Sequence, residues 1–381
     1  MRVTLVIDDL RIAGAQRVVV QEARALHPRR VAFDVVSLAP DPEPSFTTEL
    51  RAIGVRVRHV PGRGLRDVHR AGALAELIRR LRPDVVHTHL TYANILGTLA
   101  AKLAQRPCVA SIHNVDSNQL KLASPKRWLE GQVLRRWATR VVVVAEGARP
   151  RVAHNFGVPA DHLVTLSNAL DPHTVRLPVP YNRAAMRRAL GATPGESLLC
   201  TIARLDPSKG QTYFLQALAE VRARNPRIRF RALLVGDGPR REDLRRVAAS
   251  LGLADRVHLL GIRRDVAEII AASDVFVLPS LNEGLSQALL EAMALGVPVI
   301  ATDVGGTADA VVPGRTGWLV AAADSSGLAT AIDHVLGNER EAATRAAAAR
   351  NLIQRQFSLT SHLARLEDLY RQVAASPGLG R

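Results

Sequence analysis

Short apolar runs alternate with amphipathic stretches along almost the whole chain, and this alternation limits the fold more than any other feature. The runs are rich in valine and often continuous, as in RVTLVID at 2–8, VVHTHL at 85–90 and VFVLPS at 275–280. Continuous apolar runs of this length are typical of parallel strands that are covered on both faces. Their alternation with helices predicts right-handed crossovers and an α/β fold with doubly wound parallel sheets.

The alternation stops once and then starts again, which predicts two domains. The interruption is a proline-containing stretch from 167 to 197, SNALDPHTVRLPVPYNRAAMRRALGATPGES, with no strand pattern. A chain of 381 residues is about the right length for two ordinary cores. We expect an N-terminal domain at 1–170 and a C-terminal domain at 171–357, with a last helix at about 358–381 that packs back on the first. Ligands of such domains bind beyond the carboxyl ends of the strands, here in a cleft between the two sheets.

The apolar runs and the cysteines indicate a soluble protein in a reducing compartment. The first apolar run stops at Asp8 and Asp9, too early for a secretory signal, and no run approaches the ~20 residues of a membrane span. The two cysteines, Cys108 and Cys200, have no metal-binding spacing, and we interpret them as buried thiols. We expect a cytoplasmic protein, with peripheral attachment to the inner face of the membrane as an alternative.

The net charge of +16 has two interpretations. It can indicate an anionic partner, such as a membrane, a nucleic acid or a phosphorylated substrate. It can also reflect biased base composition, because only four of the 51 basic residues are lysines. Nucleic-acid binding is disfavoured, since aromatic residues are 4% of the chain and no zinc-finger spacing is present.

The basic stretch KLASPKRWLEGQVLRRWATR at 121–140 also has two interpretations. With two tryptophans it could rest on an anionic membrane. Leu129, Val133 and Trp137 are spaced as on one face of a helix, which favours a packed helix instead.

Two stretches of the second half carry charges where ligands bind. In TIARLDPSKGQ, Arg204 ends a strand and Lys209 stands at the next helix start, so both cations can reach one diphosphate; solvated surface charges are the alternative. In LNEGLSQALLEAMALG, Glu283 follows a strand, and Glu291 lies in the second turn of a helix that we expect to begin near Leu285. A buried carboxylate there needs donors such as ribose hydroxyls, unless it is a solvated helix residue.

Other candidate residues are weaker by themselves. Gly14 lies at a strand-to-helix turn, where a backbone can approach a ligand. The glycine pair in DVGGTADAV can form an anion-binding nest, with Asp309 three residues later. His87, His89 and His113 lie near strand ends, but no carboxylate or cysteine joins them at ligand spacing, so we expect no metal site. His113 alone could bind a substrate by a hydrogen bond.

Together these stretches resemble the retaining glycosyltransferases of family 4, which have the GT-B fold of two Rossmann-like domains. The most specific part is EGLSQALLEAMALGVPVIAT at 283–302, and ARLDPSKG, VGDGP and RVHLLG precede it in the family order. The resemblance extends from Gly14 to about Leu319. It implies transfer of a hexosyl group from a nucleoside diphosphate sugar, UDP before GDP, without a metal or other cofactor. The implied acceptor is a glycan, a lipid-linked sugar or a small molecule, in the synthesis of cell-surface polysaccharide or glycoconjugates.

The resemblance also implies roles for single residues. Arg204 and Lys209 would hold the diphosphate, Glu283 the donor-sugar hydroxyls, and Glu291 the ribose. Backbone amides near Gly284 and Leu285 would assist Glu283. Gly14 would lie under the diphosphate, His113 would lie near the reacting sugar, and the loop after Gly261 would meet the nucleobase.

The chain departs from the family pattern in places. It has Gln16 and Asp309 where glutamates are frequent, NALD in place of NG[IV]D, and VVVVAE in place of VVAVSE. These changes leave the acceptor side and the role of Asp309 open. Two rival functions also stay open: a GT-B-fold UDP-sugar epimerase, and a non-catalytic protein that binds a nucleotide sugar or a polyanion.

Overall fold

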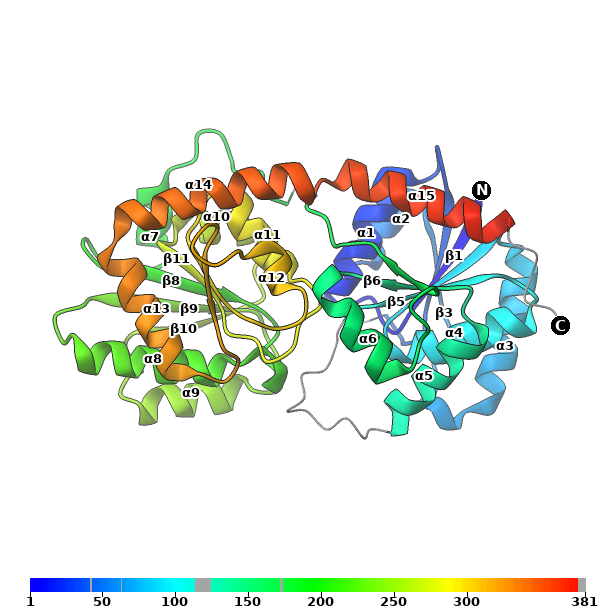
Figure 1. Cartoon of the computed structure of the whole chain (residues 1–381), viewed down its shortest axis with the longest axis horizontal. Helices are drawn as coiled ribbons and strands as arrows, with labels where there is room; N and C mark the ends of the chain where they lie inside the picture. The colour runs from blue at the N-terminus through cyan, green and yellow to red at the C-terminus, as the bar shows by residue number, and fades with distance from the viewer. Residues whose placement is uncertain (42, 63, 114–124, 172–173, 376–381) are drawn as a thin grey trace. The chain divides into compact units, whose positions relative to one another are not determined.

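The protein consists of two α/β units, each built around one parallel sheet (Figure 1). The computed structural model describes residues 1–41, 43–62, 64–113, 125–171 and 174–375. Unit 1 comprises residues 1–168 and 360–381, and unit 2 comprises residues 169–359. The predicted α/β class and the two Rossmann-like domains are confirmed.

Unit 1 has a seven-stranded sheet with the order β3-β2-β1-β4-β5-β6-β7, and every pairing is parallel. Its elements are β1 Arg2–Ile7, α1 Gly14–Leu26, β2 Ala32–Ser37, α2 Thr47–Ala52, β3 Arg56–His59, η1 Gly64–Arg66, α3 Val68–Leu81, β4 Val85–His89, α4 Thr91–Leu103, β5 Cys108–Ile112, α5 Pro125–Trp137, β6 Arg140–Val143, η2 Glu146–Ala148, α6 Arg149–Phe156, β7 Leu163–Thr165 and, from the end of the chain, α15 Leu359–Ala375.

Unit 2 has a six-stranded sheet with the order β10-β9-β8-β11-β12-β13, again parallel throughout. Its elements are α7 Arg183–Ala189, β8 Ser197–Ile202, η3 Pro207–Lys209, α8 Gln211–Arg224, β9 Phe230–Val235, α9 Arg241–Ser250, β10 Val257–Gly261, α10 Val266–Ala272, β11 Val275–Leu278, α11 Gln287–Ala294, β12 Val299–Thr302, α12 Thr307–Ala310, β13 Trp318–Val320, α13 Ser325–Gly337 and α14 Glu339–Gln356.

The cores lie between each sheet and the helices on its two faces (Figure 1). Every residue of β4, β5, β11 and β12 is buried, which agrees with the continuous apolar runs that predict these strands. Cys108 and Cys200 are free, buried thiols, and burial raises the pKa of each to about 12. Among the described residues, no helix is both long enough and apolar enough to span a bilayer.

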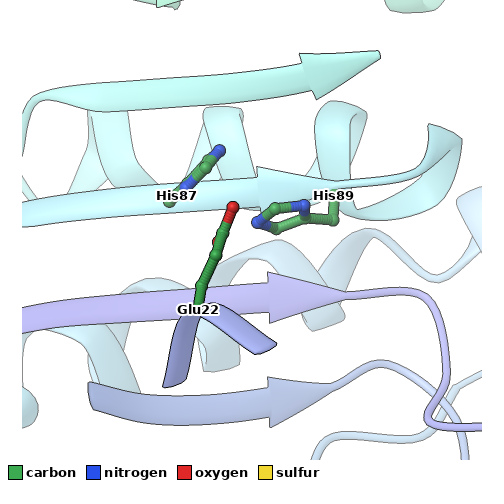
Figure 2. A group of neighbouring side chains, drawn as sticks. All are labelled: Glu22, His87 and His89. Carbon is green, nitrogen blue, oxygen red and sulfur yellow. The ribbon is translucent and has the colours of Figure 1, made fainter. Parts of the chain in front are cut away.

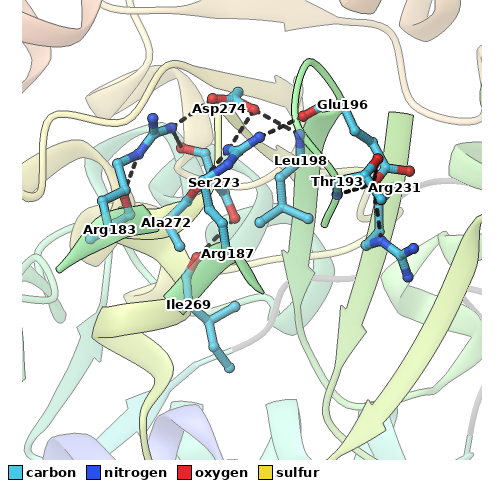
Figure 3. A network of polar contacts seen from close by, with 11 residues as sticks. Arg183, Arg187, Thr193, Glu196, Leu198, Arg231, Ile269, Ala272, Ser273 and Asp274 are labelled. Atoms are coloured by element: carbon cyan, nitrogen blue, oxygen red, sulfur yellow. Dashed lines mark hydrogen bonds and ion pairs between the residues drawn. The ribbon is translucent and has the colours of Figure 1, made fainter. Parts of the chain in front are cut away.

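The stretch before β8, where the sequence predicts no strand, contains the short helix α7. Asn182 caps this helix by accepting a hydrogen bond from the amide of Ala185, at 2.9 Å. Arg183 and Arg187 of α7 both pair with Asp274, at 2.6 and 2.8 Å, and Asp274 also accepts the amide of Leu198 in β8 at 2.7 Å (Figure 3). One carboxylate thus holds α7 against the sheet of unit 2.

Candidate functional site

The predicted cations and the first predicted carboxylate of unit 2 follow two neighbouring strands of one sheet. Arg204 and Lys209 follow β8, and Glu283 follows β11, the strand beside β8. The chain winds from β8 to β9 on one side and continues with β11 and β12 on the other, so β8 and β11 flank the reversal of strand order. Ligands of doubly wound sheets bind outside the carboxyl ends of the strands at such a reversal.

Lys209 and Glu283 form a partly buried ion pair, with 2.8 Å between Nζ and Oε1. Ser280 donates a second hydrogen bond to the same oxygen, also at 2.8 Å. Only 9% of the Glu283 side chain and 20% of the Lys209 side chain are exposed. Arg204 lies nearby in the chain and is exposed, and within the described residues its guanidinium has no ion-pair partner. The arrangement offers a bound carboxylate for hydroxyl groups and one open cation for an anion.

Backbone contacts at glycines hold these loops in place. A Cβ at Gly210 would lie 1.9 Å from the carbonyl oxygen of Pro279. The loops after β8 and β11 are therefore in close backbone contact at this point. A Cβ at Gly236 would lie 2.1 Å from the carbonyl oxygen of Ala203. A Cβ at Gly305 would lie 1.7 Å from the carbonyl oxygen of Glu283. All three glycines have positive φ, which other residues rarely adopt. The loops after β8, β9, β11 and β12 therefore form one closely packed frame.

Glu291 is buried within α11, with 3% of its surface exposed, so it is not a solvated helix residue. Helix α11 begins at Gln287, two residues later than expected, because Ser286 acts as its N-cap and accepts the amide of Leu289. Glu291 still lies in the second turn.

The loop that carries Gly284 and Leu285 is fixed by its own backbone. The Gly284 carbonyl accepts the amide of Gly306 at 2.6 Å, and Leu285 is buried. Asp309 lies in α12, four residues after Gly305. Gly261 ends β10 and accepts the amide of Gly236, so the loop after it starts beside the same frame.

In unit 1, Gly14 begins α1, and neither packing nor conformation requires a glycine there. A Cβ at this position would meet no heavy atom within 4 Å, and its φ is not positive. The N-cap residue Ala13 makes no side-chain cap bond to α1. The free space and the amides of the first turn are compatible with an anion.

Asp8, which follows β1, binds backbone amides at the start of α4. It accepts hydrogen bonds from the amides of Ala93, at 2.6 Å, and Tyr92, at 3.3 Å. Burial raises the pKa of Asp8 to about 7 in spite of these bonds.

His113 follows β5 and belongs to a buried cluster, which we call the histidine cluster: His87, His89, His113 and Glu22. The Nε2 atom of His113 lies 2.9 Å from Nδ1 of His89. His87 lies between the hydroxyls of Tyr370 and Ser111, at 2.7 and 2.8 Å. Burial lowers the pKa of His113 to about 4 and that of His87 to about 3, and it lowers the pKa of His89 well below its usual value.

The expectation that no carboxylate joins these histidines is wrong. Glu22 of α1 points at the rings of His87 and His89 (Figure 2), and one ligand atom from each of the three lies within 4.8 Å of the others. Sequence spacing could not reveal this, because Glu22 is more than 60 residues away from His87. A glutamate among the apolar residues of an amphipathic helix was the available signal.

Ser280 and Tyr370 are the other polar residues that the motifs missed. Ser280 is fully buried and donates a hydrogen bond to Glu283, so it belongs to the candidate site of unit 2. Tyr370 comes from α15, at the far end of the chain, and only its buried hydroxyl indicates a partner.

Comparison with known families gives two matches that together span most of the chain. The family described as Glycosyltransferase Family 4 matches residues 12–174, and the one described as Glycosyl transferases group 1 matches residues 196–338. The first of these regions lies almost entirely in unit 1, and the second lies in unit 2.

Individual relatives align over most of their length. The D-inositol 3-phosphate glycosyltransferase of Actinosynnema mirum is 33% identical over 85% of this chain and 84% of its own. The UDP-Gal:alpha-D-GlcNAc-diphosphoundecaprenol alpha-1,3-galactosyltransferase of Escherichia coli is 28% identical over 94% of both chains.

Solved structures agree with the fold. HepE of Anabaena, crystallised with UDP-glucose, superimposes with a TM-score of 0.87 at 23% identity, covering 98% of this chain and 100% of that one. WaaG, a glycosyltransferase of lipopolysaccharide biosynthesis, superimposes with a TM-score of 0.77 at 18% identity, over 97% and 99% of the two chains. With its two parallel sheets, its order of motifs and its full-length relatives, the chain belongs to glycosyltransferase family 4 and has the GT-B fold.

Proposed function

We propose that the protein transfers a hexosyl group from a nucleoside diphosphate sugar to an acceptor hydroxyl and retains the anomeric configuration. The observation that carries this proposal is the Lys209–Glu283 ion pair at the carboxyl ends of β8 and β11, with the exposed cation of Arg204 just after the end of β8. UDP is the preferred nucleotide, since UDP-galactose stands in the name of the Escherichia coli relative. GDP is the second choice, because a mannosyltransferase of Mycolicibacterium smegmatis, 33% identical over 72% of this chain, is named as GDP-mannose-dependent.

In this proposal the diphosphate binds to Arg204 and Lys209. Negative charge develops on the diphosphate as the sugar departs, and a positioned cation stabilises charge most where it develops. Glu283 gives up part of its interaction with Lys209 and accepts hydrogen bonds from hydroxyl groups of the donor sugar. Glu291 accepts the ribose hydroxyls, and Gly14 leaves room for the diphosphate at the start of α1.

The acceptor oxygen bonds to the anomeric carbon on the face from which the diphosphate leaves, as the bond from that carbon to the phosphate oxygen breaks. The hydroxyl proton passes to the departing phosphate oxygen, so retention needs no nucleophile from the protein. The two basic side chains supply the positive charge that a divalent metal supplies elsewhere, and we expect transfer to continue in chelator. The acceptor is a glycan, a lipid-linked sugar or a small molecule; the relatives named above act on a lipid-linked sugar and on inositol 3-phosphate.

The test is a thermal-shift panel of nucleotide sugars, followed by transfer assays with the donor that stabilises most. We expect one UDP-sugar to raise the melting temperature and then to give an acceptor-dependent product whose anomeric configuration matches the donor. An altered sugar nucleotide formed without acceptor would indicate the epimerase instead. Binding with neither hydrolysis nor transfer would indicate a non-catalytic binder.

We also propose that α5 contacts an anionic membrane at the inner face, since lipid-linked acceptors reside there. Trp128 is 67% exposed, and Arg135 and Arg136 of the same helix are exposed. The buried residues Val133 and Leu134 show that the helix also packs on unit 1, and residues 121–124 lie outside the described part of the chain. Binding to anionic vesicles should weaken with salt and in a variant with Arg135→Glu and Arg136→Glu. Equal binding to neutral and anionic vesicles would contradict the proposal.

A further inference from the structure

The histidine cluster contains polar atoms that its own contacts do not satisfy. Nε2 of His89 and Oε2 of Glu22 are both buried without a hydrogen-bond partner among the described residues. Figure 2 shows a carboxylate oxygen of Glu22 beside the near ring nitrogen of His89. Two buried polar atoms that face one another interact electrostatically even beyond hydrogen-bond distance, because the local dielectric is low.

The contacts of His362 determine what Glu22 can offer to His89. Nδ1 of His362 lies 2.9 Å from the carbonyl oxygen of Ser167, which can only accept, so Nδ1 carries a proton. Nε2 of His362 lies 3.0 Å from Oε1 of Glu22. That bond needs a second proton, which belongs either to His362 as an imidazolium or to Oε1 as a carboxylic acid. In both cases Oε2 of Glu22 has no hydrogen and can only accept.

An acceptor beside Nε2 of His89 favours a proton on that nitrogen, since the alternative places two lone pairs face to face. A neutral His89 with its proton on Nε2 has a bare Nδ1. Nδ1 of His89 is the atom that contacts Nε2 of His113, at 2.9 Å. The proton in this bond must then come from His113, which leaves Nδ1 of His113 bare.

We propose that Glu22 and His89 are positioning residues that fix the tautomer of His113, so that His113 carries its proton on Nε2 and offers Nδ1 only as an acceptor. As far as His113 serves the donor sugar, this inference rests on the function proposed above. His113 then accepts a hydrogen bond from a sugar hydroxyl and does not donate one to a phosphate. The lowered pKa of both histidines agrees with neutral rings.

A metal ion between Glu22, His87 and His89 is the competing interpretation. It is less favoured because both ring nitrogens of His87 already have hydroxyl partners, so a metal must displace Tyr370 or Ser111. A metal on Nε2 of His89 also requires that nitrogen to be bare, which is the opposite tautomer. Metal analysis of the purified protein therefore separates the two: one equivalent of bound metal that is lost in His89→Phe would overturn the proposal.

The direct test is ¹⁵N NMR of the histidine-labelled protein at pH 7.5, because protonated and bare ring nitrogens have clearly separate shifts. The His113 signals are assigned by their loss in His113→Gln. We expect a protonated Nε2 and a bare Nδ1. A protonated Nδ1, alone or in an imidazolium, would overturn the proposal without reference to any activity.

Two substitutions at position 22 test the part played by Glu22. In Glu22→Gln the amide nitrogen donates to the bare Nε2 of a neutral His362, and the amide oxygen still faces His89, so the tautomer of His113 should persist. Glu22→Leu removes the acceptor, and a substantial fraction of His113 should move its proton to Nδ1. Glu130→Leu is the matched control, since Glu130 is also buried in unit 1 but contacts Asn94. An unchanged His113 tautomer in Glu22→Leu would exclude Glu22 as its determinant.

Binding measurements link the tautomer to the donor. In Glu22→Leu we expect affinity for the UDP-sugar to fall about tenfold, the loss of roughly one good hydrogen bond, while affinity for UDP changes less than about twofold. Equal losses for both ligands would show a merely structural role. If the wild-type protein binds no nucleotide at all, the proposed function fails while the NMR result on the tautomer still stands.

Discussion

Two carboxylates eight residues apart, Glu283 and Glu291, are both buried, and their surroundings separate their roles. At the strand end, Glu283 forms an ion pair with Lys209 and accepts a hydrogen bond from Ser280. Glu291 is buried in α11, whose other residues after Gln287 are apolar. A general acid and base would face one another across a substrate, whereas these two lie on successive elements of one unit.

The first prediction separates the two carboxylates by their ligands. Glu291→Ala should weaken binding of both UDP and the UDP-sugar, because ribose is common to them. Glu283→Ala should weaken binding of the UDP-sugar and leave UDP affinity within about threefold, since UDP lacks the hexosyl group whose hydroxyls Glu283 would hold. Calorimetric titration of each variant with each ligand measures the four affinities. An unchanged UDP affinity in Glu291→Ala would refute its ribose role.

The second prediction concerns the pH dependence of stability at Asp8. Its folded pKa of about 7 lies above the ~3.9 of an unfolded aspartate, so the folded state binds the extra proton between these values. The stabilisation is therefore present below about pH 4, declines as pH rises toward 7, and changes little above it. Asp8→Asn lacks this titration. Denaturant unfolding from pH 5 to 8 should show the wild type losing free energy of unfolding relative to Asp8→Asn, and parallel curves would contradict the assignment.

At the scale of elements, the loops that carry the candidate site of unit 2 are packed backbone against backbone. This explains why the glycines at 210, 236 and 305 stand where they do, a requirement that their sequence neighbours alone do not reveal. Turn formation accounts for a glycine at a strand end just as well, and only the contact distances distinguish a turn from a close approach.

The third prediction tests that frame. Gly305→Ala should lower the free energy of unfolding by about 2–5 kcal/mol, because overpacking against the Glu283 carbonyl adds to left-handed strain. The matched control is Gly195→Ala, whose φ is also positive but whose Cβ would meet nothing within 4 Å; it should lose only about 1–2 kcal/mol. Donor affinity should fall in the first variant alone. Equal losses of stability would show that the close approach is unimportant.

At the scale of the whole molecule, the alternation of strands and helices is sufficient to predict two parallel sheets. Strands such as β4 and β11 are short, continuous and apolar, so their pattern is unambiguous. The short helix α7 was missed, since its seven residues depend on Asn182 and on Asp274, which is distant in sequence.

The candidate site was predictable to the extent that it is local in sequence. Arg204, Lys209 and Glu283 lie on motifs at strand ends, and the sheet order places those ends side by side. The histidine cluster was not predictable, because Glu22 from α1 and Tyr370 from α15 meet β4 only in the folded unit. Long-range polar contacts of this kind leave no spacing pattern.

The central claim is that Arg204 and Lys209 stabilise the departing diphosphate. The most direct test is the turnover of Arg204→Ala and Lys209→Ala in the transfer assay at saturating donor, with Arg188→Ala, an exposed cation of α7, as the control. We predict losses of roughly 10²–10³ in turnover, the usual effect of removing one electrostatic stabiliser. Turnover within about threefold of the wild type in both variants would contradict the account.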